Sequence, residues 1–213
     1  EIFEQPRAVT DTIRGRLSKE HGDGILEEIH LDPPALKEIQ RISLIACGTS
    51  YHAALVGKFL IEGFCRVPVE AAIGAEFRYR NLILRKDDLL IAVSQSGETA
   101  DTLAALREGK RKGASTLAIC NVVESSLARD SDYVIYTHAG PEIGVASTRT
   151  FATQLVILFL LGLRIGRELG LLSKEKGKTL IEELVRVPHV MEEILKTSTQ
   201  VAKIARKYLH ARD

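Results

Sequence analysis

Residues 89–99 read LLIAVSQSGET and show the architecture of the chain most clearly. The first five residues are apolar, and a glycine among hydroxyl side chains follows almost directly. A short, continuous apolar run is typical of a strand that is buried on both faces of a parallel sheet. The glycine and its hydroxyl neighbours predict a tight loop that leads into a helix.

The same pattern recurs along the chain between residues 41 and 136. Apolar runs that predict strands occur at Ile42–Ala46, Val67–Ile73, Leu89–Val93, Thr116–Cys120 and Tyr133–Tyr136, with helical segments between them. Parallel strands need long crossover connections, which helices normally provide. The predicted fold class is therefore α/β: a three-layer α/β/α sandwich with a five-stranded parallel sheet.

The two ends of the chain differ from this central part. Residues 7–17 follow Pro6 with apolar residues at helical spacing, which predicts an amphipathic lead-in helix. Beyond residue 172 the sequence is rich in Lys and Glu and predicts two helices, the first of which Pro188 should break or kink. We expect a linker with the lead-in helix at 1–40, a central domain at 41–172 and a helical extension at 173–213.

Composition excludes several classes of protein. The formal net charge of +1 over 213 residues is too small to attract nucleic acid or an anionic membrane without specific contacts. The apolar run Leu155–Leu163 is too short to cross a bilayer and predicts a buried helix. The cysteines Cys47, Cys65 and Cys120 form neither a disulfide framework nor a metal-binding pattern, which indicates the cytoplasm and no metal site.

Three loops combine glycine with hydroxyl side chains beyond predicted strands: Cys47–Ser50, Ser94–Thr99 and Glu142–Thr148. Glycine lets the backbone turn sharply, so that N–H groups and a helix N-terminus can point at one anion. The other interpretation is that these residues are ordinary helix caps and turns. Their recurrence at the end of a sheet where α/β proteins bind ligands favours a phosphate site. Nucleotide binding is a weaker alternative, because no P-loop or dinucleotide pattern is present.

Four segments resemble a known family: residues 46–51 (ACGTSY), 75–80 (AEFRYR), 94–102 (SQSGETADT) and 142–148 (EIGVAST). They are similar to the isomerase half of the glutamine–fructose-6-phosphate amidotransferases (glucosamine-6-phosphate synthases), and to its first sugar-isomerase (SIS) domain in particular. Residues 1–6, EIFEQP, resemble the linker between the glutaminase domain and that half. The resemblance covers nearly the whole chain and implies an SIS fold with a flavodoxin-like strand order.

The resemblance also implies a binding site for fructose 6-phosphate and glucosamine 6-phosphate. Three hydroxyl residues and the backbone of a glutamine would hold the phosphate: Ser94, Ser96, Thr99 and Gln95. The sugar would contact Thr49, Ser50, Val145, Ala146 and Ser147.

In this family the main catalytic residues belong to a second SIS domain, and glutamine is hydrolysed by the glutaminase domain. The resemblance therefore implies a phosphosugar-binding part of an enzyme of amino sugar biosynthesis, upstream of UDP-N-acetylglucosamine. The chain would need no cofactor, would meet L-glutamine only through the absent glutaminase domain, and would form a homodimer. We expect the isolated chain to be inactive and to lack the second SIS domain.

Two other functions stay open at this point, namely a freestanding phosphosugar isomerase and a sugar-phosphate sensor. An isomerase needs its own base, for which Glu98 is the best candidate, although a weak one, because an acidic residue near a helix N-terminus is commonly only a partner of the helix dipole. A sensor usually brings an output module such as a helix-turn-helix, and none is visible in the sequence.

Overall fold

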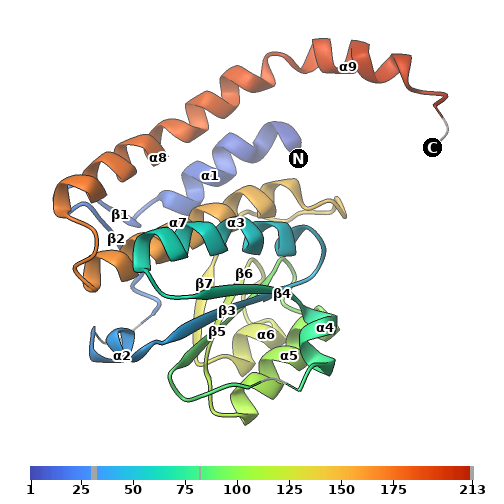
Figure 1. Cartoon of the computed structure of the whole chain (residues 1–213). Helices are drawn as coiled ribbons and strands as arrows, with labels where there is room; N and C mark the ends of the chain where they lie inside the picture. The colour runs from blue at the N-terminus through green and yellow to red at the C-terminus, as the bar shows by residue number, and fades with distance from the viewer. Residues whose placement is uncertain (30–32, 82, 212–213) are drawn as a thin grey trace.

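The structure is a computed structural model that describes residues 1–29, 33–81 and 83–211. Its central sheet has five parallel strands in the order β4-β3-β5-β6-β7 (Figure 1). These are β3 (Arg41–Ala46), β4 (Val69–Ile73), β5 (Asp88–Ser94), β6 (Ser115–Cys120) and β7 (Tyr133–Tyr136). The predicted α/β class, the five-stranded parallel sheet and the flavodoxin-like order are confirmed.

Helices cover both faces of this sheet, as the predicted three-layer sandwich requires (Figure 1). Helices α3 (Gly48–Cys65) and α7 (Thr148–Glu168) lie on one face, with α1 (Gln5–Ile13) and α8 (Lys174–Leu195) packed outside them. The other face carries α4 (Gly74–Tyr79), α5 (Ala100–Arg111) and α6 (Ser126–Asp130). The remaining elements are the 3₁₀ helix η1 (Ile2–Glu4), the hairpin β1 (Leu17–Ser18) and β2 (Asp23–Gly24), α2 (Pro33–Glu38) and α9 (Ser198–Lys207).

Alternate residues of each strand enter different cores, which explains why the apolar runs are continuous. In β5, Leu89, Ile91 and Val93 pack with α3 and α7, whereas Leu90 and Ala92 pack with the helices of the opposite face. All five side chains are fully buried. A strand covered on both faces has no position at which a polar residue would meet water.

Helix α7 lies inside the molecule. By length and composition it could cross a membrane, but 72% of its most apolar window is buried by other parts of the chain. It packs against α1 and α3 and approaches the β2 strand. The predicted buried helix at Leu155–Leu163 is confirmed as part of this core helix.

One prediction about helix ends is wrong, and a second is wrong in part. The lead-in helix ends at Ile13 instead of residue 17, because Gly15 takes a positive φ of 76° and Leu17 pairs with Gly24 in the β1–β2 hairpin. Pro188 does not break helix α8, which continues to Leu195, and the alternative that it kinks the helix stays a prediction. Leu184 and Met191 pack on the main core on either side of the proline, so tertiary contacts hold the helix together across it.

Candidate functional site

The predicted site lies where the strand order changes direction. Strand β3 has β4 on one side and β5 on the other, and Ala46 lies opposite Val93 in the β3–β5 pair. The loops that follow β3 and β5 therefore leave the sheet side by side, and their helices α3 and α5 cover opposite faces (Figure 1). In open α/β sheets this arrangement leaves a crevice at the carboxyl ends of the strands, where ligands bind.

Helices α3 and α5 begin at this edge without a side-chain cap. Helix α5 begins after Thr99 and helix α3 after Cys47, and neither residue makes a side-chain capping bond. In contrast, Ser125 caps α6 and Ser173 caps α8 through their side-chain oxygens. Two neighbouring helix N-termini thus keep their partial positive charge uncapped by a side chain at the point where a phosphate would sit.

The Ser94–Thr99 loop is held in one conformation by its own hydroxyl groups. The Ser94 Oγ atom accepts a hydrogen bond from Gly97 N (3.1 Å) and lies 3.2 Å from Thr99 Oγ1. Ser96 Oγ accepts a hydrogen bond from Glu98 N (3.1 Å). Either Ser94 or Thr99 donates its proton to the other, so one proton of this pair stays free, and Ser96 keeps its own proton. Two of the three hydroxyl protons can therefore be donated to an anion while these bonds are kept.

Gly97 lets this loop pack closely on helix α6. Its φ of 67° lies in the left-handed region, and an added Cβ would meet Ser125 Oγ at 2.1 Å. The Gly97 carbonyl accepts a hydrogen bond from Leu127 N (2.9 Å), and Gln95 O accepts one from Asn121 N (3.1 Å). The loop is therefore fixed to the segment after β6 as well as to β5.

The third loop differs from the other two, because a carboxylate already occupies the N-terminus of α7. The side chain of Glu142 accepts hydrogen bonds from Arg149 N (2.7 Å), Thr150 N (3.1 Å) and Thr150 Oγ1 (2.5 Å). This helix end is not available to a second anion. The loop instead exposes Val145 and Ala146, while Ser147 is half-buried at the start of the helix.

The predicted sugar contacts on α3 lie at different depths. Thr49 is half-buried, whereas Ser50 is buried and its Oγ accepts a hydrogen bond from Gln154 Nε2 of helix α7 (2.9 Å). On the other side of the crevice, Thr102 Oγ1 of α5 donates to Cys47 Sγ (3.6 Å). These contacts draw the beginnings of α3, α5 and α7 together at one edge of the sheet.

Glu98 points toward helix α6. Its Oε1 atom accepts a hydrogen bond from Ser126 N (2.7 Å), and this bond, with the Ser126 hydroxyl, lowers the pKa of the Glu98 carboxyl below its ordinary value. Arg129 and Arg107 lower the pKa further. The geometry therefore favours a partner of the α6 N-terminus over a catalytic acid or base.

The cysteines and histidines form no reactive cluster in the part of the chain that the structure describes. The three cysteines are free, and burial raises the pKa of the Cys65 thiol to about 12. Cys120 is also buried, and burial raises the pKa of its thiol. No group of three potential ligands that could hold a metal ion occurs among the described residues.

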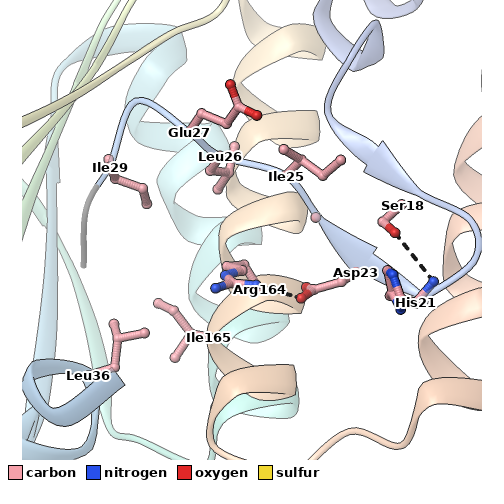
Figure 2. Close-up of a pocket in the computed structure, with 11 residues that line it drawn as sticks. Ser18, His21, Asp23, Ile25, Leu26, Glu27, Ile29, Leu36, Arg164 and Ile165 are labelled. Atoms are coloured by element: carbon pink, nitrogen blue, oxygen red, sulfur yellow. Dashed lines mark hydrogen bonds and ion pairs between the residues drawn. The ribbon is translucent and has the colours of Figure 1, made fainter. Parts of the chain in front are cut away.

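A cavity of about 760 Å³ lies away from the predicted site. Figure 2 shows Asp23 of β2 paired with Arg164 of α7, beside Leu36 of α2 and the apolar side chains of Ile25 and Leu26. Arg164 is 16 residues beyond the start of α7, which is about 24 Å along a helix. The cavity is thus near the opposite end of the sheet from the hydroxyl loops.

Two further residues, Glu142 and Gln154, shape this edge of the sheet. Glu142 belongs to the third hydroxyl loop of the sequence, and its distance of six residues from the start of α7 gives no pattern that predicts its bonds to Arg149 N and Thr150 N. Gln154 lies directly before the apolar run of α7, where a single polar residue indicates a buried hydrogen bond. Its partner Ser50 could not be identified from sequence, because 104 positions separate the two.

Comparisons with known proteins agree with this arrangement. The sequence profile of the SIS domain matches residues 35–164. The chain is 49% identical over 208 residues to the glutamine–fructose-6-phosphate aminotransferase (isomerizing) of Clostridium tetani, covering 97% of this chain and 34% of that protein. It is 48% identical over 213 residues to the protein of the same name in Chlorobaculum tepidum, covering 100% of this chain and 34% of that protein.

A solved structure is similar along almost the whole chain. It is the C-terminal domain of glucosamine-fructose-6-phosphate aminotransferase from Francisella tularensis, with a TM-score of 0.91 and 38% sequence identity. The similarity covers 97% of this chain and 58% of that one. This chain thus spans only part of its relatives, and its resemblance to one SIS domain of their isomerase half is confirmed. Since the profile matches more than half of its residues, the chain belongs to the SIS domain family.

Proposed function

We propose that this chain is a phosphosugar-binding domain that takes fructose 6-phosphate and glucosamine 6-phosphate. The observation that carries the proposal is that α3 and α5 both begin at the β3–β5 crevice without a side-chain cap, whereas α6 and α8 are capped by serines. A phosphate placed there receives helix N-termini, backbone N–H groups and neutral hydroxyl donors. No lysine or arginine is needed to hold it.

In this proposal the two parts of the ligand contact different loops. Ser94, Ser96, Thr99 and the backbone of Gln95 bind the phosphate, because their loop precedes an uncapped helix. Thr49 and Ser50 at the start of α3, and Val145, Ala146 and Ser147 before α7, contact the sugar. The Glu142 carboxylate at the α7 N-terminus supports this division, since it would repel a phosphate and tolerates a neutral sugar.

In this proposal the domain contributes to a reaction by holding the sugar phosphate in a fixed position. The relatives named above are isomerizing aminotransferases, and in such an enzyme an anchored phosphate fixes where the reacting carbons of the sugar lie. The catalytic groups and the use of glutamine belong, in this proposal, to parts outside residues 1–213. Residues 41–172 form the binding domain and residues 173–213 lead to a second SIS domain. The isolated chain then binds hexose phosphate in the cytoplasm and catalyses nothing.

Calorimetric titration of the purified chain with fructose 6-phosphate and glucosamine 6-phosphate tests the proposal. Ser96→Ala and Thr99→Val each remove one donor to a charged group, which is worth about 1.5–3 kcal/mol, so affinity should fall about 10-fold to 100-fold. Thr179→Val, on the exposed face of α8, is the matched control and should bind normally. Saturating hexose phosphate that gives no heat and no change in melting temperature would show that the proposed function is wrong.

A further inference from the structure

Glu1 lies against the loop that precedes helix α7. Its carboxylate accepts hydrogen bonds from Ile143 N (2.7 Å to Oε1) and from Gly144 N (3.0 Å to Oε2). An added Cβ at Gly144 would lie 2.4 Å from Glu1 Oε2, so any side chain at this position would displace the Glu1 carboxylate. The two amide bonds lower the pKa of the Glu1 carboxyl, which stays ionised.

Arg149 joins the same cluster from the first turn of α7. Its guanidinium is largely buried and lies 2.8 Å from Glu4 Oε2, 3.9 Å from Glu1 Oε1 and 4.0 Å from Glu142 Oε1. It also donates a hydrogen bond to the carbonyl of Pro141. Residues 1–4 therefore make charge-assisted contacts at two places: Glu1 binds the loop at residues 142–148, and Glu4 binds Arg149 just beyond it.

Apolar packing contributes little to the order of this loop. Ile143 and Val145 are 93% and 98% exposed. The turn itself is closed by a hydrogen bond from Ser147 N to Gly144 O (2.9 Å), with Ser147 at a positive φ of 51°. A displacement of Gly144 therefore moves the turn that presents Val145 and Ala146, and the polar contacts of Glu1 are what hold Gly144 in place.

We propose that Glu1 is a positioning residue for ligand binding: it holds the backbone of Ile143 and Gly144 so that residues 145–147 stand ready to contact the sugar. This inference rests on the proposed function, because it needs a sugar at that loop. It concerns the sugar and not the phosphate, since Ser94, Ser96 and Thr99 make no contact with Glu1 among their described hydrogen bonds.

The test compares two ligands with the 213-residue chain. Glu1→Gln keeps the size of the side chain and removes its charge. If the ordered loop falls to about a tenth of the population, affinity for fructose 6-phosphate falls about tenfold. Affinity for inorganic phosphate, measured in the same way or by competition, should not change. Ser96→Ala should weaken the binding of both ligands.

Glu108→Gln is the matched control. Glu108 is as exposed as Glu1, at 29% against 30%, and its pKa is also lowered by a hydrogen-bonding partner, here Arg111. It lies near the end of α5, away from the loop, and its substitution should leave both affinities unchanged. Glu1→Asp, which keeps the charge, should restore part of the affinity lost in Glu1→Gln.

Amide hydrogen exchange of Ile143 and Gly144 provides a readout that needs no ligand, and both amides should exchange faster in Glu1→Gln than in the unchanged chain. Equal exchange rates would overturn the proposal. So would normal fructose 6-phosphate affinity in Glu1→Gln while Ser96→Ala binds weakly, and in that case the proposed function would survive. An unchanged chain that binds no hexose phosphate would overturn both.

Discussion

At the scale of single residues, Gly97 is the position where backbone conformation and packing constrain the site together. A left-handed conformation costs a residue with a Cβ about 1–2 kcal/mol, and overpacking adds about 1–3 kcal/mol. Gly97→Ala adds a methyl group at 2.1 Å from Ser125 Oγ, so we expect a loss of about 2–5 kcal/mol in the free energy of unfolding. Urea denaturation measures this loss.

Gly170→Ala separates the two causes. Gly170 has a similar φ of 72°, but nothing lies within 4 Å of its added Cβ. This control should lose only about 1–2 kcal/mol, the cost of the left-handed conformation alone. Equal losses at the two positions would mean that the contact between the loop and Ser125 is not tight.

Glu98 gives a prediction about pH. Its pKa is lowered in the folded chain, first by the bond from Ser126 N, so the folded state favours the carboxylate. This contribution to stability is complete above the ordinary value of 4.5 and is lost as pH falls through the folded-state pKa. The difference in unfolding free energy between the unchanged chain and Glu98→Gln should therefore be larger at pH 7 than at pH 3.

Urea midpoints at the two pH values measure that difference, and groups that titrate in both proteins cancel. A difference that grows toward low pH would contradict the lowered pKa. The same variant should bind fructose 6-phosphate normally. Loss of binding or the presence of isomerase activity that depends on Glu98 would instead favour the freestanding isomerase.

At the scale of elements, a buried polar pair lies within the largely apolar contact between α3 and α7. Gln154 is fully buried, and its Nε2 donates to Ser50 Oγ across the interface of the two helices. Ser50→Ala leaves this amide without its partner, and we expect a loss of about 1–3 kcal/mol in the free energy of unfolding. Unfolding in urea at neutral pH gives the value.

The double variant Ser50→Ala with Gln154→Leu completes a mutant cycle. It removes both polar groups, so it should be more stable than Ser50→Ala alone, because no buried donor is left without a partner. If the losses in unfolding free energy from Ser50→Ala and Gln154→Leu simply add in the double variant, the hydrogen bond between the two side chains makes no net contribution to stability.

At the scale of the whole molecule, α8 and α9 carry apolar side chains that the described chain does not cover. Val190, Ile194, Val201 and Ile204 are 49–61% exposed, and α9 extends beyond the body of the domain (Figure 1). With a net charge of +1, two copies repel each other little. We predict that two copies pair through this surface at high concentration.

Sedimentation velocity over a range of concentrations checks the pairing. Ile194→Glu combined with Ile204→Glu should leave a monomer with an unchanged melting temperature, because neither side chain is buried. Lys203→Glu, which changes the charge of the same helix without removing an apolar side chain, is the control and should still pair. A monomer at every concentration would show that this surface serves another part of a longer protein.

Local pattern was enough to predict the strands and the type of fold. The apolar runs at β5 and β7 match the observed elements to within one residue at each end, because a doubly covered strand needs a continuous apolar run and polar residues follow it. The helix that ends at Ile13 shows the limit of such patterns, since Leu17 fits a helical stripe as well as it fits a hairpin. Only its pairing with Gly24 selects the hairpin.

The sequence also predicted that hydroxyl residues lie at the site, but it did not predict which of them cap a helix. Thr99 and Ser125 are both hydroxyl residues directly before a helix, yet only Ser125 caps one, because Thr99 Oγ1 turns to Ser94 instead. That choice depends on the side chains that surround each hydroxyl in space. The approach of Glu1 to Gly144, across 143 positions, likewise exists only once the sheet has brought distant segments together.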